Sequence, residues 1–160
     1  MKNSILSGLA GLVLGALITM FVMYQMAPGM MILEDESNYN FEESVVKFEE
    51  SVKAHGWKMP AVHDLQKTMD KFGYDVKSVK VFELCHPDHA KKILEADAER
   101  IVSSMMPCRV AIYEKNDGKT YISRMNSALM AKTMSNLIDE VMSIASSENE
   151  EILEVLLPTE

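Results

Sequence analysis

The sequence VKSVKVFELCHPDH at residues 76–89 decides much of the fold, because it ends one element and begins the next. Apolar and polar residues alternate over 76–84, which predicts a β-strand with one face against a core. Pro87 follows closely, and proline is well tolerated at the first position of a helix. We therefore expect a helix from Pro87 to about Leu94, with Cys85 at the junction between strand and helix.

The sequence on both sides of this stretch also contains patterns typical of helices, strands and turns. Apolar residues at helical spacing predict helices, alternation predicts strands, and Asn-Asp-Gly at 116–118 is a strong hairpin turn. This order, αβαβαββα, predicts an α/β (α+β) two-layer domain with a mixed sheet and helices packed on it. The expected helices are 41–55, 64–73, 87–94 with 97–104, and 126–147, and the expected strands are 57–61, 76–84, 108–114 and 119–125.

The N-terminal region has the composition of a membrane segment. No charged residue occurs from 3 to 33, and the strongly apolar part, 5–26, has 22 residues, where about 20 suffice to cross a bilayer. Lys2 precedes it and acidic residues 34–36 follow it. This asymmetry predicts a cytoplasmic N-terminus and a domain on the periplasmic or extracellular side of the cell (inner) membrane. A cleaved signal peptide is the rival interpretation, although its apolar region is usually about 7–15 residues long.

One face of this segment carries small residues at every fourth position, namely Ser7, Gly11, Gly15 and Thr19. Such a stripe lets two membrane helices approach closely, and it predicts a homodimer formed through the anchor. The alternative is that the stripe has no partner, since glycines are common in membrane helices.

The length, net charge and cysteine count limit which classes of protein this chain can belong to. The chain has 160 residues and a net charge of −8, which excludes a multidomain enzyme and argues against a nucleic-acid partner. Two cysteines are too few for a four-thiolate zinc site. We expect a membrane anchor with a Met-rich outer segment at 1–33, a linker at 34–40, an α/β domain at 41–147, and an acidic and apolar tail at 148–160.

Side chains that bind soft metals gather in two short runs. The runs are Cys85, His86 and His89, then Met106, Cys108 and the neighbouring Arg109. Thiolate, thioether and imidazole groups suit Cu(I), or Zn²⁺ if both thiols and both imidazoles converge. Alternatively, the two thiols form a disulfide, or Cys85 is a nucleophile whose pKa is lowered by the helix N-terminus and by Arg109. The plainest alternative is that both cysteines are packing residues.

The strand order decides whether Cys85 and Cys108 meet. If strands 76–84 and 108–114 are antiparallel neighbours, the two cysteines lie at the same end of the sheet. If the strands are parallel, a rise of about 3.3 Å per residue separates the cysteines by roughly 20 Å. A disulfide needs Cα atoms within about 7 Å. The sequence leaves both arrangements open.

Three stretches, taken in order, resemble the family called domain of unknown function 302, over roughly residues 41–145. They are FELCHPDHA at 82–90, MPCRVAIYE at 106–114 and TYIS at 120–123. The resemblance implies a compact two-layer α/β domain, often dimeric and sometimes held by an N-terminal anchor, and it implies no activity. The residues that match family motif positions are Cys85, Pro87, Cys108 and Arg109.

Three hypotheses for the function follow, and the first two involve no turnover enzyme, because no complete enzyme motif is present. The first is a membrane-anchored binding or redox-handling module centred on Cys85 and Cys108, with Cu(I), Zn²⁺ or thiol chemistry. The second is a non-catalytic interaction protein that dimerises and docks to a membrane complex, with both cysteines structural. A thiol enzyme acting on sulfur or peroxide species is a third hypothesis.

Overall fold

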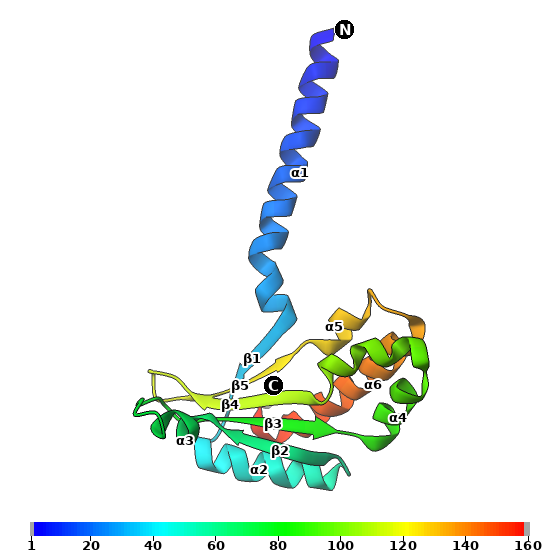
Figure 1. The fold of residues 1–160 in the computed structure, drawn as a ribbon. Coiled ribbons are helices and arrows are strands. Elements are labelled where there is room, and N and C mark those ends of the chain that lie inside the picture. Colours follow the sequence, from blue (N-terminus) through cyan, green and yellow to red (C-terminus); the bar gives the residue numbers. More distant parts are fainter. Residues whose placement is uncertain (1, 159–160) are drawn as a thin grey trace.

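A five-stranded antiparallel sheet forms the centre of the fold (Figure 1). The computed structural model describes the backbone of residues 2–158 and the side chains of residues 8 and 11–158. The strands lie in the order β1-β5-β4-β3-β2, and every neighbouring pair is antiparallel. Their bounds are β1 (Ile32–Glu36), β2 (Lys58–Asp64), β3 (Val79–Cys85), β4 (Cys108–Glu114) and β5 (Thr120–Met125).

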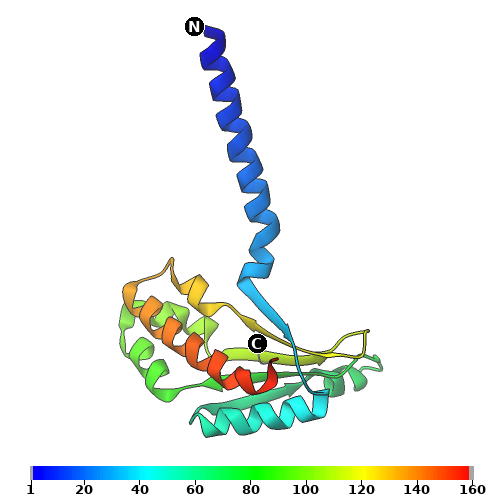
Figure 2. The ribbon, with the colours of Figure 1, turned by 180° about the vertical axis from the view of Figure 1, so that it is seen from behind.

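Helices cover one face of this sheet. Figure 2 shows α2 and α6 side by side across that face, with α4 next to one end of α6. The α-helices are α1 (Lys2–Met31), α2 (Phe41–Ala54), α3 (Leu65–Asp70), α4 (Pro87–Glu95), α5 (Ser127–Ala131) and α6 (Asn136–Leu153), and the 3₁₀ helices are η1 (Asp97–Met105) and η2 (Glu154–Leu156). The expected combination of a sheet with helices is confirmed. The expected mixed sheet is wrong, because α4 and η1 return the chain to the same end of the sheet, so that β4 runs antiparallel to β3.

The main core lies between the sheet and the two covering helices. Inward-facing side chains alternate along the strands, as with Phe82 and Leu84 on β3 and Val110 and Ile112 on β4. Phe48 of α2 packs edge-on against Phe82, with ring centroids 5.1 Å apart. Burial of each such side chain contributes about 1.5–3 kcal/mol, so the covering helices are fixed firmly on the sheet.

The segment expected as a linker, 34–40, contributes an edge strand instead. Residues 34–36 belong to β1, which pairs with β5. Arg124 of β5 is 7% exposed and forms ion pairs with Asp35 of β1 and Glu150 of α6. This buried guanidinium joins β1, β5 and α6, so the domain begins about ten residues earlier than expected.

The C-terminal segment is also part of the fold. Residues 148–153 continue α6, and η2 follows directly. Ile152, Leu153 and Leu156 are fully buried in the main core. The expectation of a separate tail at 148–160 therefore differs from the structure over the described residues up to 158. The expected final helix is also divided into α5 and α6.

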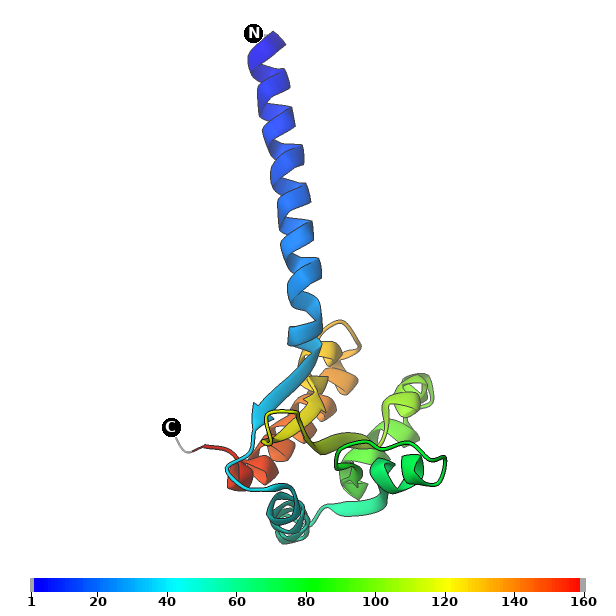
Figure 3. The same ribbon diagram turned by 90° about the vertical axis from the view of Figure 1, so that its left-hand side faces the viewer.

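Helix α1 extends away from the domain (Figures 1 and 3). Its part Gly11–Met31 is long and apolar enough to cross a membrane, and none of it is buried in the protein. Signal sequences meet the same criterion. In the small-residue stripe, Thr19 Oγ1 donates to the Gly15 carbonyl at 3.0 Å, and the Ser7 side chain lies outside the described residues. Dimerisation through this stripe stays a prediction.

Candidate functional site

The two cysteines lie where β3 ends and β4 begins. β3 ends at Cys85, His86 occupies the N-cap of α4, and proline follows in the first turn. Leu84 of β3 lies opposite Cys108 of β4 in the antiparallel ladder. Cys85 and Cys108 are therefore at the same end of the sheet, and both are half-buried free thiols. Of the two arrangements that the sequence left open, the structure has the antiparallel one.

Beside the cysteines lies a cluster of two imidazoles, one carboxylate and one indole, made by His86, His89, Glu148 and Trp57. The rings of His86 and His89 are 4.4 Å apart between centroids, because residues three apart lie on the same side of a helical turn. Glu148 approaches from α6, and its Oε2 atom is 3.0 Å from His89 Nε2. The same oxygen accepts a 3.0 Å hydrogen bond from Trp57 Nε1. One carboxylate oxygen thus joins three separate segments of the chain.

Two ring nitrogens of this cluster lack a partner. Within the part of the chain that the structure describes, Nδ1 of His86 and Nδ1 of His89 are buried and form no hydrogen bond. A buried polar atom without a partner costs about 1–3 kcal/mol, and in native proteins such an atom needs a functional or structural reason. His86, His89 and Glu148 also each offer one ligand atom, and these three atoms lie within 4.8 Å of one another. The three residues therefore lie close enough together to hold one small cation.

The surroundings favour a charged carboxylate and a neutral thiol. Burial acts to raise the pKa of Glu148, but the hydrogen bonds from His89 and Trp57 outweigh it and hold the pKa below the ordinary 4.5. Burial, with a smaller contribution from Cys85, raises the pKa of the Cys108 thiol above the ordinary 9.0. At neutral pH the Cys108 thiol is therefore protonated. The nucleophile expected from the sequence is Cys85, and that expectation stays a prediction.

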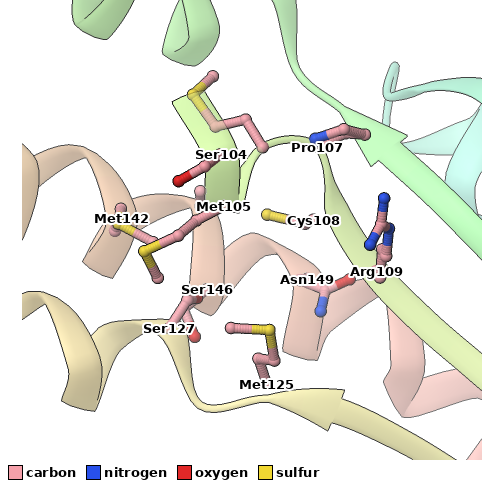
Figure 4. A pocket seen from close by; sticks show the side chains of 12 residues that line it. Ser104, Met105, Pro107, Cys108, Arg109, Met125, Ser127, Met142, Ser146 and Asn149 are labelled. Carbon is pink, nitrogen blue, oxygen red and sulfur yellow. The ribbon is translucent and has the colours of Figure 1, made fainter. Parts of the chain in front are cut away.

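Two cavities share Cys108 and residues 105–107 as lining. The smaller has a volume of about 50 Å³, which exceeds the roughly 10–15 Å³ that one water requires. The larger has a volume of about 150 Å³ and extends to Asn149 on α6 (Figure 4). The cluster residues Trp57, His86 and His89 line the smaller cavity.

All five metal ligands expected from the sequence line this smaller cavity, namely Cys85, His86, His89, Met106 and Cys108. Arg109 is placed differently. Its Nη2 atom donates a 3.1 Å hydrogen bond to Glu83 on the neighbouring strand, and its side chain is exposed. Arg109 does not line the smaller cavity, but it is among the residues that line the larger one (Figure 4).

Two cluster residues, Trp57 and Glu148, were not expected from the sequence. The sequence predicts a strand that begins at Trp57, and it predicts an acidic and apolar tail that begins at Glu148. A signal for Glu148 does exist, since it lies seven residues after Val141 and three after Ala145, both buried on α6. That spacing places it on the buried side of one continuous helix.

Comparisons with known proteins agree with this fold. A solved structure, described as the crystal structure of uncharacterized conserved protein DUF302 from Bacillus stearothermophilus, matches with a TM-score of 0.70. The match covers 79% of this chain and 98% of that chain at 20% sequence identity, which shows a shared fold. No curated protein matches the chain significantly. The family described as Domain of unknown function DUF302 matches residues 33–156. Because this match spans most of the chain, from β1 to η2, the chain belongs to the DUF302 family.

Proposed function

We propose that this protein is a membrane-anchored, extracytoplasmic module that binds a transition-metal ion through His86, His89 and Glu148. The observation that carries the proposal is the convergence of two imidazoles and a carboxylate, whose three ligand atoms lie within 4.8 Å of one another. The apolar helix α1 supports the anchor.

The donor set favours Zn²⁺. Two imidazoles and one carboxylate form a common three-ligand zinc set, with a fourth position left for water or another ligand. Ligand bonds of about 2.0–2.1 Å at tetrahedral angles place neighbouring ligand atoms roughly 3.3 Å apart. The separation of 3.0 Å between His89 Nε2 and Glu148 Oε2 is already close to that value. Small side-chain movements would therefore complete the site.

The two thiols and the Met106 thioether would allow the site to bind Cu(I) as well as Zn²⁺. Cys85 and Cys108 line the same cavity as the two histidines, so either sulfur is a candidate for the fourth position. Thiolate and thioether ligands select Cu(I). Because the pKa of Cys108 is raised, its coordination would require loss of a proton, and metal affinity would then increase with pH.

Competition with a chromophoric chelator tests the proposal on the full-length protein, purified reduced in detergent micelles. We expect one Zn²⁺ per chain, with the affinity lowered at least about 100-fold in His86→Ala and in Glu148→Gln. His63→Ala is the matched control, because His63 pairs with Glu83 at 3.2 Å on the exposed side of the sheet, away from the cavity. This control should bind Zn²⁺ as the parent does.

Parallel titrations with Cu(I) of the double variant Cys85→Ser/Cys108→Ser distinguish the metals. Loss of Cu(I) binding with retained Zn²⁺ binding would assign the thiols to copper and the His–Glu cluster to zinc. If neither metal binds the parent stoichiometrically, the proposal fails, and the interaction protein that docks to a membrane complex becomes the leading hypothesis.

A further inference from the structure

The larger cavity forms a chamber rich in thioethers. Four methionines line it, Met105 and Met106 from the end of η1, Met125 from the end of β5 and Met142 from α6, and Cys108 adds a thiol (Figure 4). Methionine side chains are flexible and polarisable, and their sulfurs make favourable contacts with aromatic rings. Met125 is 43% exposed, so the cavity reaches the surface of the molecule.

A buried amide without a partner also lines this cavity. Asn149 is 7% exposed, and its Oδ1 atom is buried without a hydrogen-bond partner. Over residues 11–158, whose side chains the structure describes, its amide forms no hydrogen bond. Burial of such a group without compensation costs about 1–3 kcal/mol, which a purely structural residue at this position would not require. A leucine would serve packing better, so the amide indicates a ligand with a matching polar group.

We propose that this cavity binds a small aromatic or similarly compact apolar molecule that carries one hydroxyl group. Its volume of about 150 Å³ equals that of an engineered apolar cavity that holds benzene. A hydroxyl both donates and accepts a hydrogen bond, so it pairs with Asn149 in either orientation of the amide. The methionines contact the ring, and Asn149 selects the hydroxyl. The two cavities share part of their lining, including Met106 and Cys108, but Asn149 and Met125 belong to the larger cavity alone. The comparison of phenol with benzene at Asn149 therefore does not depend on the proposed metal.

Phenol and benzene form a matched pair of probes for this proposal. The full-length protein is labelled with ¹³C at the methionine methyl groups in detergent micelles and titrated by NMR with each probe. We expect saturable shifts at Met105, Met106, Met125 and Met142. The methionines of α1 are an internal control, because partition of the probes into the micelle shifts them without saturation.

Two variants test the assignment. Ser146 lines the cavity, whereas its neighbour Ser147 is exposed, so Ser146→Leu should abolish the saturable shifts and Ser147→Leu should leave them unchanged. Asn149→Leu should weaken phenol binding about 5-fold and leave benzene binding unchanged, because only the hydrogen bond is lost.

Several outcomes would overturn the proposal. Shifts that never saturate in the parent, or saturable shifts that persist in Ser146→Leu, would show that the cavity is not a binding site. Equal weakening of phenol and benzene in Asn149→Leu would show that the amide does not select the hydroxyl. The comparison of phenol and benzene binding in Asn149→Leu still tests the proposal if Ser146→Leu does not fold.

Discussion

Trp57 influences the charge state of Glu148 through one hydrogen bond, at 3.0 Å. Trp57→Phe keeps an aromatic ring beside His86 and His89 but removes the donor. We expect the pKa of Glu148 to rise, since one of the groups that lowers it is gone. The affinity for Zn²⁺ should fall about 10-fold, as is usual when a metal ligand loses its outer partner. NMR titration of the Glu148 carboxyl carbon and chelator competition measure the two effects.

The same hydrogen bond has a consequence for stability in acid. Because the folded-state pKa of Glu148 lies below the ordinary 4.5, its contribution to stability is present above about pH 4.5 and is lost as the pH falls through the folded pKa. In Trp57→Phe that contribution should be smaller and should be lost at a higher pH. Urea unfolding at several pH values measures it, with Glu148→Gln as the variant that cannot titrate. An identical acid dependence in Trp57→Phe and the parent would contradict this account.

Cys108 should be a slow nucleophile. Its thiol is partly buried and its pKa is raised by burial and by Cys85, whereas the thiolate is the species that reacts. In a Cys85→Ser background, we expect alkylation of Cys108 by iodoacetamide at pH 7.5 to be at least roughly 10-fold slower than in the urea-unfolded chain. The rate should increase steeply above pH 9. Equal rates in the folded and unfolded chains would show that Cys108 is a free, reactive thiol.

The C-terminal elements close the main core. Ile152, Leu153 and Leu156 are fully buried, and their burial contributes roughly 5–9 kcal/mol in total. That sum is comparable with the 5–15 kcal/mol that stabilises a typical domain. A chain that ends at Glu151 should therefore not fold, as judged by the near-ultraviolet circular dichroism of Trp57. A chain that ends at Leu157 is the control and should remain folded, and a folded Glu151 truncation would contradict the assigned role.

Periodicity predicts the interior of this fold better than its edges. The expected helix 41–55 and strand 108–114 agree closely with α2 and β4, because both carry apolar residues at the period of their element. Strand β1 lacks that signal, since three of its five residues are acidic. Its stability depends on distant partners, such as Lys119, which donates to Glu36 at 2.8 Å. A local pattern cannot reveal such pairing.

In the candidate site, too, local sequence predicts some residues, and others depend on contacts between distant segments. The sequence predicts His86 and His89 as ligands because both imidazoles lie in one short run with Cys85 at the start of a helix. Glu148 belongs to the site only because α6 runs across the start of α4, as Figure 2 shows. The sequence places it in an acidic run that is typical of a solvated surface. The third ligand therefore depends on the packing of two helices and not on any local motif.

The larger cavity and helix α1 adjoin each other. Met125, which lines the cavity, pairs with Ile32 at the start of β1. The next residue, Asn126, donates hydrogen bonds to the carbonyl groups of Met30 and Met31 at the end of α1. If α1 spans the membrane, this cavity lies near the bilayer surface, where small apolar molecules with one hydroxyl concentrate. The proposed anchor and the proposed ligand therefore fit one arrangement of the molecule.

The charges on the two sides of the apolar helix predict that the domain is exported. Lys2 precedes the apolar helix, and the first basic residue after it is Lys47. This excess of positive charge on the N-terminal side predicts a cytoplasmic N-terminus. In bacterial cells we expect alkaline phosphatase fused after residue 160 to be active and to remain in the membrane fraction after carbonate extraction. The same fusion without residues 2–31 should be inactive.

Phosphatase activity and membrane association together distinguish an exported anchored domain from a cleaved signal sequence and from a cytoplasmic domain. Active phosphatase released in soluble form would show that α1 is a cleaved signal sequence, and the module would then act free in the extracytoplasmic space. Inactive phosphatase in the membrane fraction would place the domain in the cytoplasm. In that compartment thiols are kept reduced, and Cys85 and Cys108 would need no bound metal to remain unoxidised. An exported domain is different, because an oxidising compartment favours a disulfide, and coordination of both thiols by a metal would protect them from forming one.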